Sequence, residues 1–366
     1  MKEKLKSEKH QIIFELKKNK IIFKKEKIII VIITSIIISS YSIIDLNDLD
    51  ESKYSYITLK IGQGNNYVYS NTISKKPKII YINENKQEKV ESKYEFKELE
   101  NSVILIWENY VDSCCKMFHS CKEIIEMNLT HFNTSQVSNM LSMFDDCTNL
   151  KNLDVSNIDT SKVLGMGRMF FGCSSLISLD LSNFDTSSNT NIGTMFQGCS
   201  SLKYVDLSSF NTSKINYFDN LFNGCKSLTS IDLSSFNTSK VTHMNNMFRD
   251  CESLTSINIS NFNTKEVENF NNIFDGCKSL VYLDFQDMDL SSADHIGNMF
   301  DKCNNLIYVN IKNYKIDNNN RNYDFFKNSP SNIAVCTENE ELKKKIKQYK
   351  GCSFIGCSNN WYELMN

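Results

Sequence analysis

Residues 227–251 read SLTSIDLSSFNTSKVTHMNNMFRDC, and this stretch decides the fold. Apolar side chains follow Cys225 by three, six, eight and eleven residues, at Leu228, Ile231, Leu233 and Phe236. The step from six to eight predicts a short strand, with two side chains pointing inward and polar side chains pointing outward. After the turn at residues 237–239, apolar residues return at spacings of three and four, which predicts one face of a short helix.

The same pattern recurs every 26 residues. A Met, Leu or Ile followed by Phe, two further residues and Cys occurs eight times, and its cysteines, called the ladder cysteines below, are Cys121, Cys147, Cys173, Cys199, Cys225, Cys251, Cys277 and Cys303. Phe326 keeps the phase once more, but Ser329 replaces the cysteine and Pro330 follows, so the regular array ends there. Repeats of this length bury their apolar faces only by stacking on one another. The sequence therefore predicts an α/β fold: a leucine-rich-repeat-like solenoid over residues 103–336, with one short parallel strand and one short helix in each 26-residue coil.

The repeat resembles a known family. Residues 227–251 are similar to the BspA-type leucine-rich repeat, which occurs in bacterial surface proteins, in mycoplasma lipoproteins and in surface proteins of some protists. Within the array, Asn189 replaces an inward Val, and Met288, Leu290 and Ala293 weaken one copy. The resemblance implies adhesion, host or matrix contact, or another form of surface recognition, and it brings no catalytic residues with it.

Both ends of a stacked array need a cap, because the terminal coils otherwise expose their core. Alternating apolar residues from Ile57 to Ile61 and a strand-like run at residues 78–82 predict a small β cap over residues 54–102. Downstream, residues 333–335 predict a last strand. The capping-box spacing from Thr337 to Glu340 then predicts a helical C-terminal cap over residues 337–366.

The N-terminal region has a different composition. Residues 1–27 form a basic tail with ten Lys and four Glu, a charge of +6 that leaves −8 for the remainder. Residues 28–44 are uncharged and lack Pro and Gly, and their length reaches the short limit for crossing a bilayer core. An acidic linker, residues 45–53, follows. The positive-inside rule predicts a single-pass membrane protein with a cytosolic N-terminus and extracellular or luminal repeats, anchored through Ile28–Ile44. A cleaved signal peptide, which would give a secreted protein, and a buried core segment are the alternatives.

Thirteen cysteines on the exported side of a membrane suggest disulfides, but eight of them share one phase. Stacked coils place equivalent Cβ atoms about 4.8 Å apart with parallel vectors, beyond the roughly 3.5–4.5 Å that a disulfide needs. The ladder cysteines are therefore predicted to be buried free thiols. Cys336, Cys352 and Cys357 lie outside the ladder, and we expect a disulfide among these three.

Enzymatic chemistry is not expected. His243 and His295 share a phase but lie two coils apart, roughly 10 Å, which is too far for one zinc ion. No catalytic Ser-His-Asp or Cys-His arrangement, phosphate-binding glycine loop or metal-ligand spacing stands out. We expect no enzyme activity, no cofactor and no metal, and the overall charge of −2 gives no sign of nucleic-acid binding.

The outward strand positions are the candidate binding site. The residue seven positions after each ladder cysteine is Asp or Asn, and Tyr stands two positions earlier in three coils. Tyr supplies contact area at small entropic cost, and Asp supplies charged hydrogen-bond acceptors that orient a partner. This face therefore suits a basic partner, a glycan or a cation. The predicted binding residues are Tyr204, Asp206, Asp232, Tyr282, Asp284 and Tyr308.

Two functions follow from this pattern. The first is a surface protein that recognises a protein or glycan through its strands. The clustering of tyrosine and acidic residues favours this function. The second is a structural or coat component that associates with its own copies and has no specific ligand. The polar strand residues also have a simpler explanation, which is that they keep an exposed face soluble.

Overall fold

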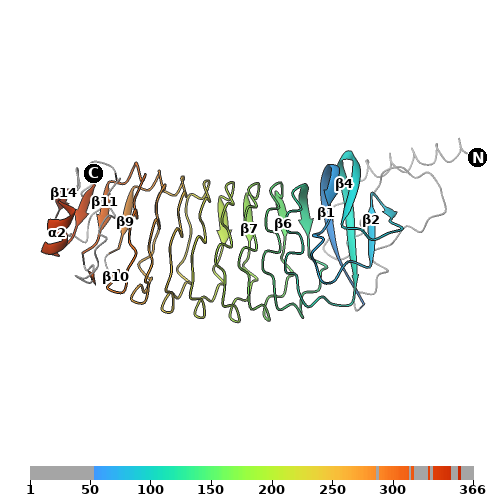
Figure 1. Ribbon diagram of the computed structural model, residues 1–366, viewed down its shortest axis with the longest axis horizontal. Coiled ribbons are helices and arrows are strands. Elements are labelled where there is room, and N and C mark those ends of the chain that lie inside the picture. Colours follow the sequence, from blue (N-terminus) through green and yellow to red (C-terminus); the bar gives the residue numbers. More distant parts are fainter. Residues whose placement is uncertain are drawn as a thin grey trace, which may run out of the picture. The chain divides into compact units, whose positions relative to one another are not determined.

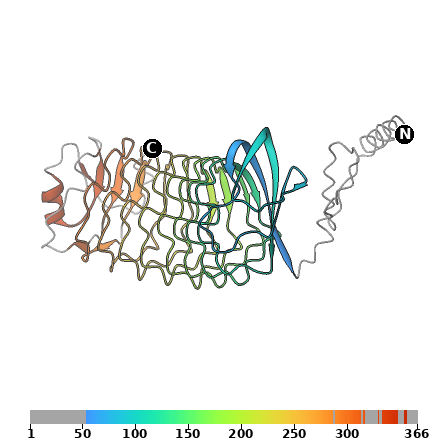
Figure 2. The same cartoon turned by 45° about the vertical axis from the view of Figure 1, so that its right-hand side comes forward.

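The computed structural model describes residues 53–285, 288–312, 315–316, 329, 333–347 and 353–355. The chain divides into two compact units, Met1–Lys53 and Tyr54–Asn366, and every element below belongs to the second unit. The predicted basic tail, the apolar segment Ile28–Ile44 and the acidic linker up to residue 52 lie outside the described residues. Within the second unit the coils stack one behind another (Figures 1 and 2).

The first coil is covered by an antiparallel sheet. Its long strands are β1 (Tyr54–Tyr67) and β4 (Lys93–Glu108), which pair with each other, and β2 (Ile79–Ile82) and β3 (Asn85–Lys86) extend the sheet beyond β4. On its other edge β1 pairs antiparallel with β5 (Ile124–Asn128), the first strand of the solenoid. The edge of the first coil is thus hydrogen-bonded to a non-repeat strand.

The coils contribute very short parallel strands. These are β6 (Asn152–Asp154), β7 (Ser178–Asp180), β8 (Tyr204–Asp206), β9 (Tyr282–Asp284) and β11 (Tyr308–Asn310). β5 pairs with β6, β7 with β8, and β9 with β11, always in parallel and with a register of 26 residues. A further parallel pair, β10 (Asp289–Leu290) with β12 (Lys315–Ile316), lies at the following turn of the coil. The 26-residue period predicted from the sequence is therefore the coil-to-coil register.

The predicted helix in each coil is wrong, because this part of the coil is a run of tight turns. Residues five positions and one position before each ladder cysteine have a positive φ, for example Asn220 at 55° and Gly224 at 77°. An α-helix cannot contain left-handed residues at these positions. The N–H groups also have two destinations: that of Cys225 bonds the Phe222 carbonyl within the turn, at 3.0 Å, whereas that of Phe222 bonds the Met247 carbonyl in the next coil, at 2.9 Å. The fold is therefore a β-solenoid with almost no helix.

Phenylalanine and cysteine side chains form the core in continuous columns. The Phe residues three positions before the ladder cysteines stack on one another from Phe118 to Phe300, with ring centroids 5.4–6.3 Å apart. All of these rings are almost completely buried. Because each coil supplies one ring to the column, no coil can bury its core without its neighbours.

A column of buried threonines, thirteen residues after the ladder cysteines, forms hydrogen bonds between each coil and the next. The Thr134 hydroxyl donates to the Asp159 carbonyl at 3.0 Å and accepts the Asp159 N–H at 2.8 Å. Thr residues in the five following coils make the same pair of bonds, and all six are at most 2% exposed: Thr134, Thr160, Thr186, Thr212, Thr238 and Thr264. These side chains replace the backbone pairing that a continuous strand would supply at this corner.

The predicted helical cap is not supported. The helix α2 (Glu340–Ile346) has seven residues and lies in sequence between β13 (Ala334–Cys336) and β14 (Ser353–Ile355). β14 pairs with β13 in parallel, so the sheet β14-β13-β11-β9 continues past the helix. The end of the sheet is therefore a strand, because backbone pairing continues where the sequence suggested that a helix would cover the core.

The predicted single-pass membrane location is corrected by the same elements. No helix among the described residues is long and apolar enough to span a bilayer. α2, the one helix in the described ranges, extends only about 10 Å at 1.5 Å per residue, whereas a bilayer core is about 30 Å thick.

Candidate functional site

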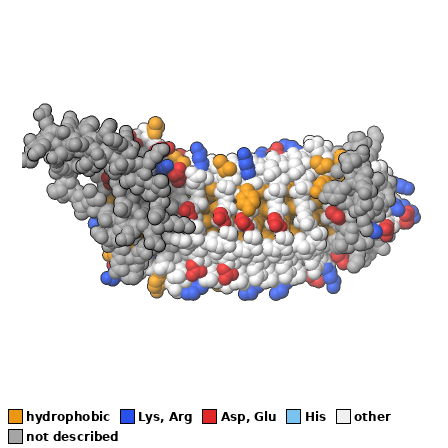
Figure 3. All heavy atoms as spheres, turned by 180° about the vertical axis from the view of Figure 1, so that it is seen from behind, with side chains coloured by type: hydrophobic (Ala, Val, Ile, Leu, Met, Phe, Trp, Pro, Cys, Tyr) orange, Lys and Arg blue, Asp and Glu red, His pale blue; other side chains and the backbone are white. Residues whose placement is uncertain are grey.

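The outward positions of the strands form one polar surface. In β7 and β8, Leu179 and Val205 point into the core. Tyr204 and Asp206 point outward, where they lie beside Ser178 and Asp180 of the neighbouring coil in register. We call the outward residues five and seven positions after the ladder cysteines the strand face. Figure 3 shows acidic side chains in a row along one face, hydrophobic side chains beside them, and basic side chains along its edges.

In seven of the eight coils, the Asp or Asn of the strand face closes the turn that follows it. The Asp180 carboxylate accepts the N–H of Ser182 at 3.0 Å, and Asp206 accepts that of Ser208 at 2.9 Å. Asp232 accepts the N–H of Ser234 at 2.9 Å in the same way. The side chains are thus held by local turns of the Asx type, which is a structural reason for this residue type at every coil.

The carboxylates of Asp180, Asp206 and Asp232 have lowered pKa values, although the charge of Asp206 opposes the shift at its two neighbours. Hydrogen bonds from Ser182 hold the pKa of Asp180 below its ordinary value, and those from Ser208 do the same for Asp206. The negative charge of Asp206 acts in the opposite direction on the pKa of Asp180 and of Asp232. The row therefore presents a negative charge on each of successive coils, at intervals of about 4.8 Å.

Two exposed apolar side chains lie on or next to the strand face. Tyr204 is 59% exposed, and Ile177, on the preceding coil, is 51% exposed. The Ile177 carbonyl accepts the N–H of Lys203 at 2.8 Å, so Ile177 is adjacent to the start of β8. Ile177 was not among the predicted binding residues. The residue four positions after the ladder cysteine is Ile or Lys in the first four coils and Thr, Thr, Val and Ile in the next four, so an apolar residue at this outward position is the signal in the sequence.

The C-terminal half of the predicted site differs from the N-terminal half. Tyr282 and Asp284 are half-buried in β9. Tyr308 is only 5% exposed, and burial, followed by the charge of Asp284, raises its pKa. Tyr308 is therefore not part of an exposed surface. The exposed residues of the predicted set are Tyr204 and Asp232, with the half-buried Asp206 between them in the row, and the structure adds the exposed Asp180 and Ile177 and the half-buried Asp154.

The ladder cysteines are buried free thiols, as the coil spacing predicts. They are also hydrogen-bond donors, which the sequence did not indicate. From Cys147 to Cys303, each thiol donates to the carbonyl of the Phe residue 29 positions earlier, at 3.0–3.2 Å. Burial raises the pKa of Cys199 and Cys303 to about 12, so these thiols have no nucleophilic form at neutral pH. Cys336 is disulfide-bonded, whereas Cys352 and Cys357 lie outside the described residues.

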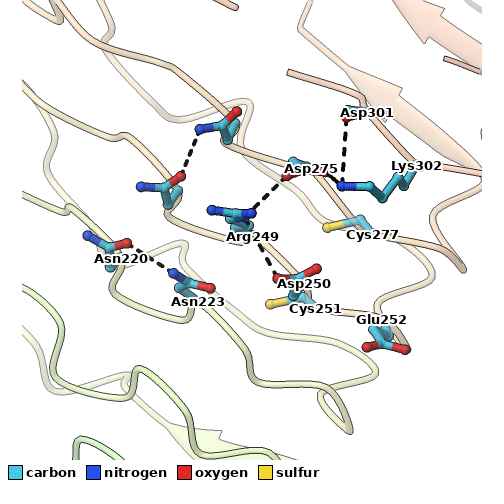
Figure 4. A network of polar contacts seen from close by, with 12 residues as sticks. Asn220, Asn223, Arg249, Asp250, Cys251, Glu252, Asp275, Cys277, Asp301 and Lys302 are labelled. Atoms are coloured by element: carbon cyan, nitrogen blue, oxygen red, sulfur yellow. Dashed lines mark hydrogen bonds and ion pairs between the residues drawn. The ribbon is translucent and has the colours of Figure 1, made fainter. Parts of the chain in front are cut away.

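A second group of charges lies at the turns (Figure 4). The Asp275 carboxylate, 5% exposed, lies 3.2 Å from Arg249 Nε and 3.3 Å from Lys302 Nζ. Burial raises the pKa of Asp275, and the two cations act against this. The group joins three successive coils through ion pairs. Nowhere among the described residues do three or more His, Cys, Asp or Glu side chains converge to hold a metal ion.

Comparison with known proteins places the repeats in a family. The description "Mycoplasma protein of unknown function, DUF285" matches residues 112–230 and 200–314. No curated protein matches the chain. Among solved structures, the chain is similar to "The Crystal structure of Pneumococcal vaccine antigen PcpA" at 13% identity, over 67% of this chain and 76% of that one, with a TM-score of 0.21. The BspA-type assignment stays a prediction. Because the two family matches together span more than half of its length, the chain belongs to the DUF285 family of mycoplasma proteins of unknown function.

Proposed function

We propose that this protein is exported to the cell surface and recognises a protein or glycan partner through the exposed part of its strand face. The observation that carries the proposal is the exposure of Tyr204, at 59%, directly beside the ionised Asp206. A large aromatic ring left in water next to a fixed charge is typical of the residues that dominate binding energy at interfaces.

The chemistry of the cysteines supports export. Disulfides form and persist in oxidising compartments, and Cys336 is disulfide-bonded. The ladder cysteines escape oxidation in such a compartment because they are buried and because coil spacing keeps them from pairing. The resemblance of the repeats to BspA-type surface proteins points the same way.

Two experiments test the proposal. A glycan and protein array probed with the full chain should yield a partner whose binding is weakened at least tenfold by Tyr204→Ser. Serine occupies the same position in the neighbouring coils, at Ser178 and Ser230, so this variant should fold. Tyr217→Asn, which removes another exposed tyrosine outside the strand face, is the matched control.

Location is tested separately. Protease added to intact cells should remove a C-terminal epitope tag. Protection of the tag until the cells are lysed would contradict export, and equal loss of binding in the Tyr204 and Tyr217 variants would contradict the strand face as the site.

A further inference from the structure

We infer that the partner of the strand face is an extended polypeptide segment that carries arginine, and that its guanidinium group binds at the two-coil patch formed by Ile177, Tyr204, Asp180 and Asp206. The inference rests on the proposed function and adds the chemical class of the partner and the place where it docks.

The apolar half of the patch suits a long side chain that ends in a planar cation. The Tyr204 ring is exposed, and the Ile177 side chain is exposed on the adjoining coil. An arginine places its methylene stem on apolar surface of this kind and keeps its charged end in water. Its guanidinium also stacks on an aromatic face, which adds a cation–π attraction.

The acidic half of the patch requires more than one donor from the cation. Asp180 and Asp206 are paired in register on neighbouring strands, at a separation set by the sheet spacing of about 4.8 Å. No ion pair with Lys, Arg or His is made by either carboxylate within the part of the chain that the structure describes. A guanidinium has five N–H donors in a rigid fork and can bridge two carboxylates, whereas the ammonium of lysine is a compact point charge.

The hydrogen bonds already present orient these carboxylates. Each accepts an N–H from the turn after its strand, Asp180 from Ser182 and Asp206 from Ser208. The side chains therefore do not need to be ordered when a partner binds, which lowers the entropic cost of binding.

The same geometry favours an extended partner over a single small cation. Asp154 and Asp232 repeat the acidic position one coil to either side of the patch, so the negative row continues along the stack. The residue before Tyr204 is the exposed Lys203, which holds the same repeat position as Ile177 and bonds its carbonyl, so a lysine borders the apolar half of the patch. A cationic segment should therefore follow the aspartate row and avoid the lysine edge.

The experiment uses two labelled peptides and the full chain. One peptide alternates arginine with serine over eight residues, and the other replaces every arginine with citrulline, which has the same shape without the charge. Fluorescence anisotropy at low salt measures the affinity of each. We expect the arginine peptide to bind and the citrulline peptide to bind at least tenfold more weakly.

Matched variants locate the binding. Asp180→Asn with Asp206→Asn removes two charges and keeps the turn, since Asn128 and Asn258 make the same bond to the residue two positions later. This pair should weaken binding at least tenfold. The control is Asp159→Asn with Asp185→Asn, which makes an equal change of net charge in a different row of turns. Asn133 and Asn211 occupy the same position in other coils and accept the same hydrogen bond, so asparagine is tolerated there. The control pair should leave the affinity unchanged.

The outcomes separate this inference from the proposed function. Equal weakening by both asparagine pairs, or equal binding of both peptides, would overturn the arginine site by showing attraction to overall charge or to the peptide backbone. An array partner that depends on Tyr204 but not on Asp180 and Asp206 would also overturn it, while the proposed function would stand. A glycan as the only array partner would have the same consequence.

Discussion

The Sγ atom of Cys199 lies 3.0 Å from the carbonyl oxygen of Phe170, so a thiol in one coil donates a hydrogen bond to the backbone of the coil before it. The same carbonyl also accepts the N–H of Cys173 at 3.1 Å. A cysteine column is therefore both a packing element and a row of bonds between coils. This explains why cysteine, and not alanine or valine, occupies the position in every regular coil.

The first prediction concerns this bond. Cys199→Ala should destabilise the protein by about 1–3 kcal/mol, because it removes both a donor and a buried atom. Cys199→Ser keeps a donor that faces the Phe170 carbonyl, so it should cost less than the alanine variant. Urea denaturation measures both. A larger loss for serine than for alanine would mean that the thiol acts only as an apolar group.

The second prediction concerns thiol reactivity. Cys115 is half-buried, whereas Cys114 and the ladder cysteines are buried. Burial also raises the pKa of Cys199 to about 12, which leaves almost no thiolate. Iodoacetamide should label Cys115 in the native protein and the ladder cysteines only after denaturation without reductant, as counted by mass spectrometry. Ladder thiols that appear only after reduction would contradict the geometric argument from coil spacing.

The sequence predicts the repeat period and the buried residues of this fold more reliably than the backbone conformation within each coil. Leu228 and Leu233 were correctly predicted to be buried, because inward side chains recur at fixed positions of the repeat and form columns through the stacked coils. The turn run was mistaken for a helix because Met244, Met247 and Phe248 have spacings that fit either structure. Distinguishing evidence was present one position before the ladder cysteines, where Gly172 and Gly224 recur, since glycine tolerates the positive φ found there.

The candidate site was harder to predict, for a different physical reason. Equal phase in the sequence implies an equal direction of the side chain, and Tyr204 and Tyr308 do share a phase. Exposure also depends on what covers a coil, and Tyr308 is buried near the C-terminal end of the solenoid whereas Tyr204 is not. A periodic pattern contains no information about such non-repeating cover.

A third prediction tests the threonine column. The Thr212 hydroxyl donates to the Asn237 carbonyl at 2.9 Å and accepts the Asn237 N–H at 2.8 Å. Thr212→Val has nearly the same shape but leaves both backbone groups without this partner, so it should cost about 2–4 kcal/mol. Thr190→Val, at an exposed threonine, should change the stability by less than about 0.5 kcal/mol. Thermal denaturation of the two variants provides the comparison, and equal melting temperatures would refute a structural role for the column.

The fourth prediction concerns Asp219, whose pKa is raised by burial while His243 acts against the shift. Its Oδ1 atom is buried without a hydrogen-bond partner among the described residues. Because the folded state holds the proton more tightly than the unfolded state, the protein loses stability as the pH rises through the raised pKa. Asp219→Asn should therefore stabilise the protein by about 1 kcal/mol at pH 7. The gain should vanish at pH 3, below the ordinary value of 3.8.

Asp206→Asn is the control for this pH dependence. Hydrogen bonds from Ser208 lower the pKa of Asp206, so the ionised form is favoured by folding and the sign is opposite. Stability from Asp206 is present at neutral pH and is lost as the pH falls through its lowered pKa. Its asparagine variant should show no gain at pH 7. If the two variants behave alike across this pH range, the opposite pKa shifts of the two carboxylates are not the cause.

The last prediction concerns Asn189, which is completely buried in a column whose other members are apolar: Val137, Val163, Ile215, Val241, Val267 and Ala293. Its Oδ1 accepts the N–H of Asn191 at 2.8 Å, but its Nδ2 has no partner among the residues that the structure describes. An unsatisfied buried donor costs about 1–3 kcal/mol, more than one ordinary hydrogen bond returns. Asn189→Val should therefore stabilise the protein by about 1 kcal/mol. Val163→Asn creates the same defect one coil earlier and should destabilise the protein, and a loss of stability in both variants would show that Asn189 is bonded in solution.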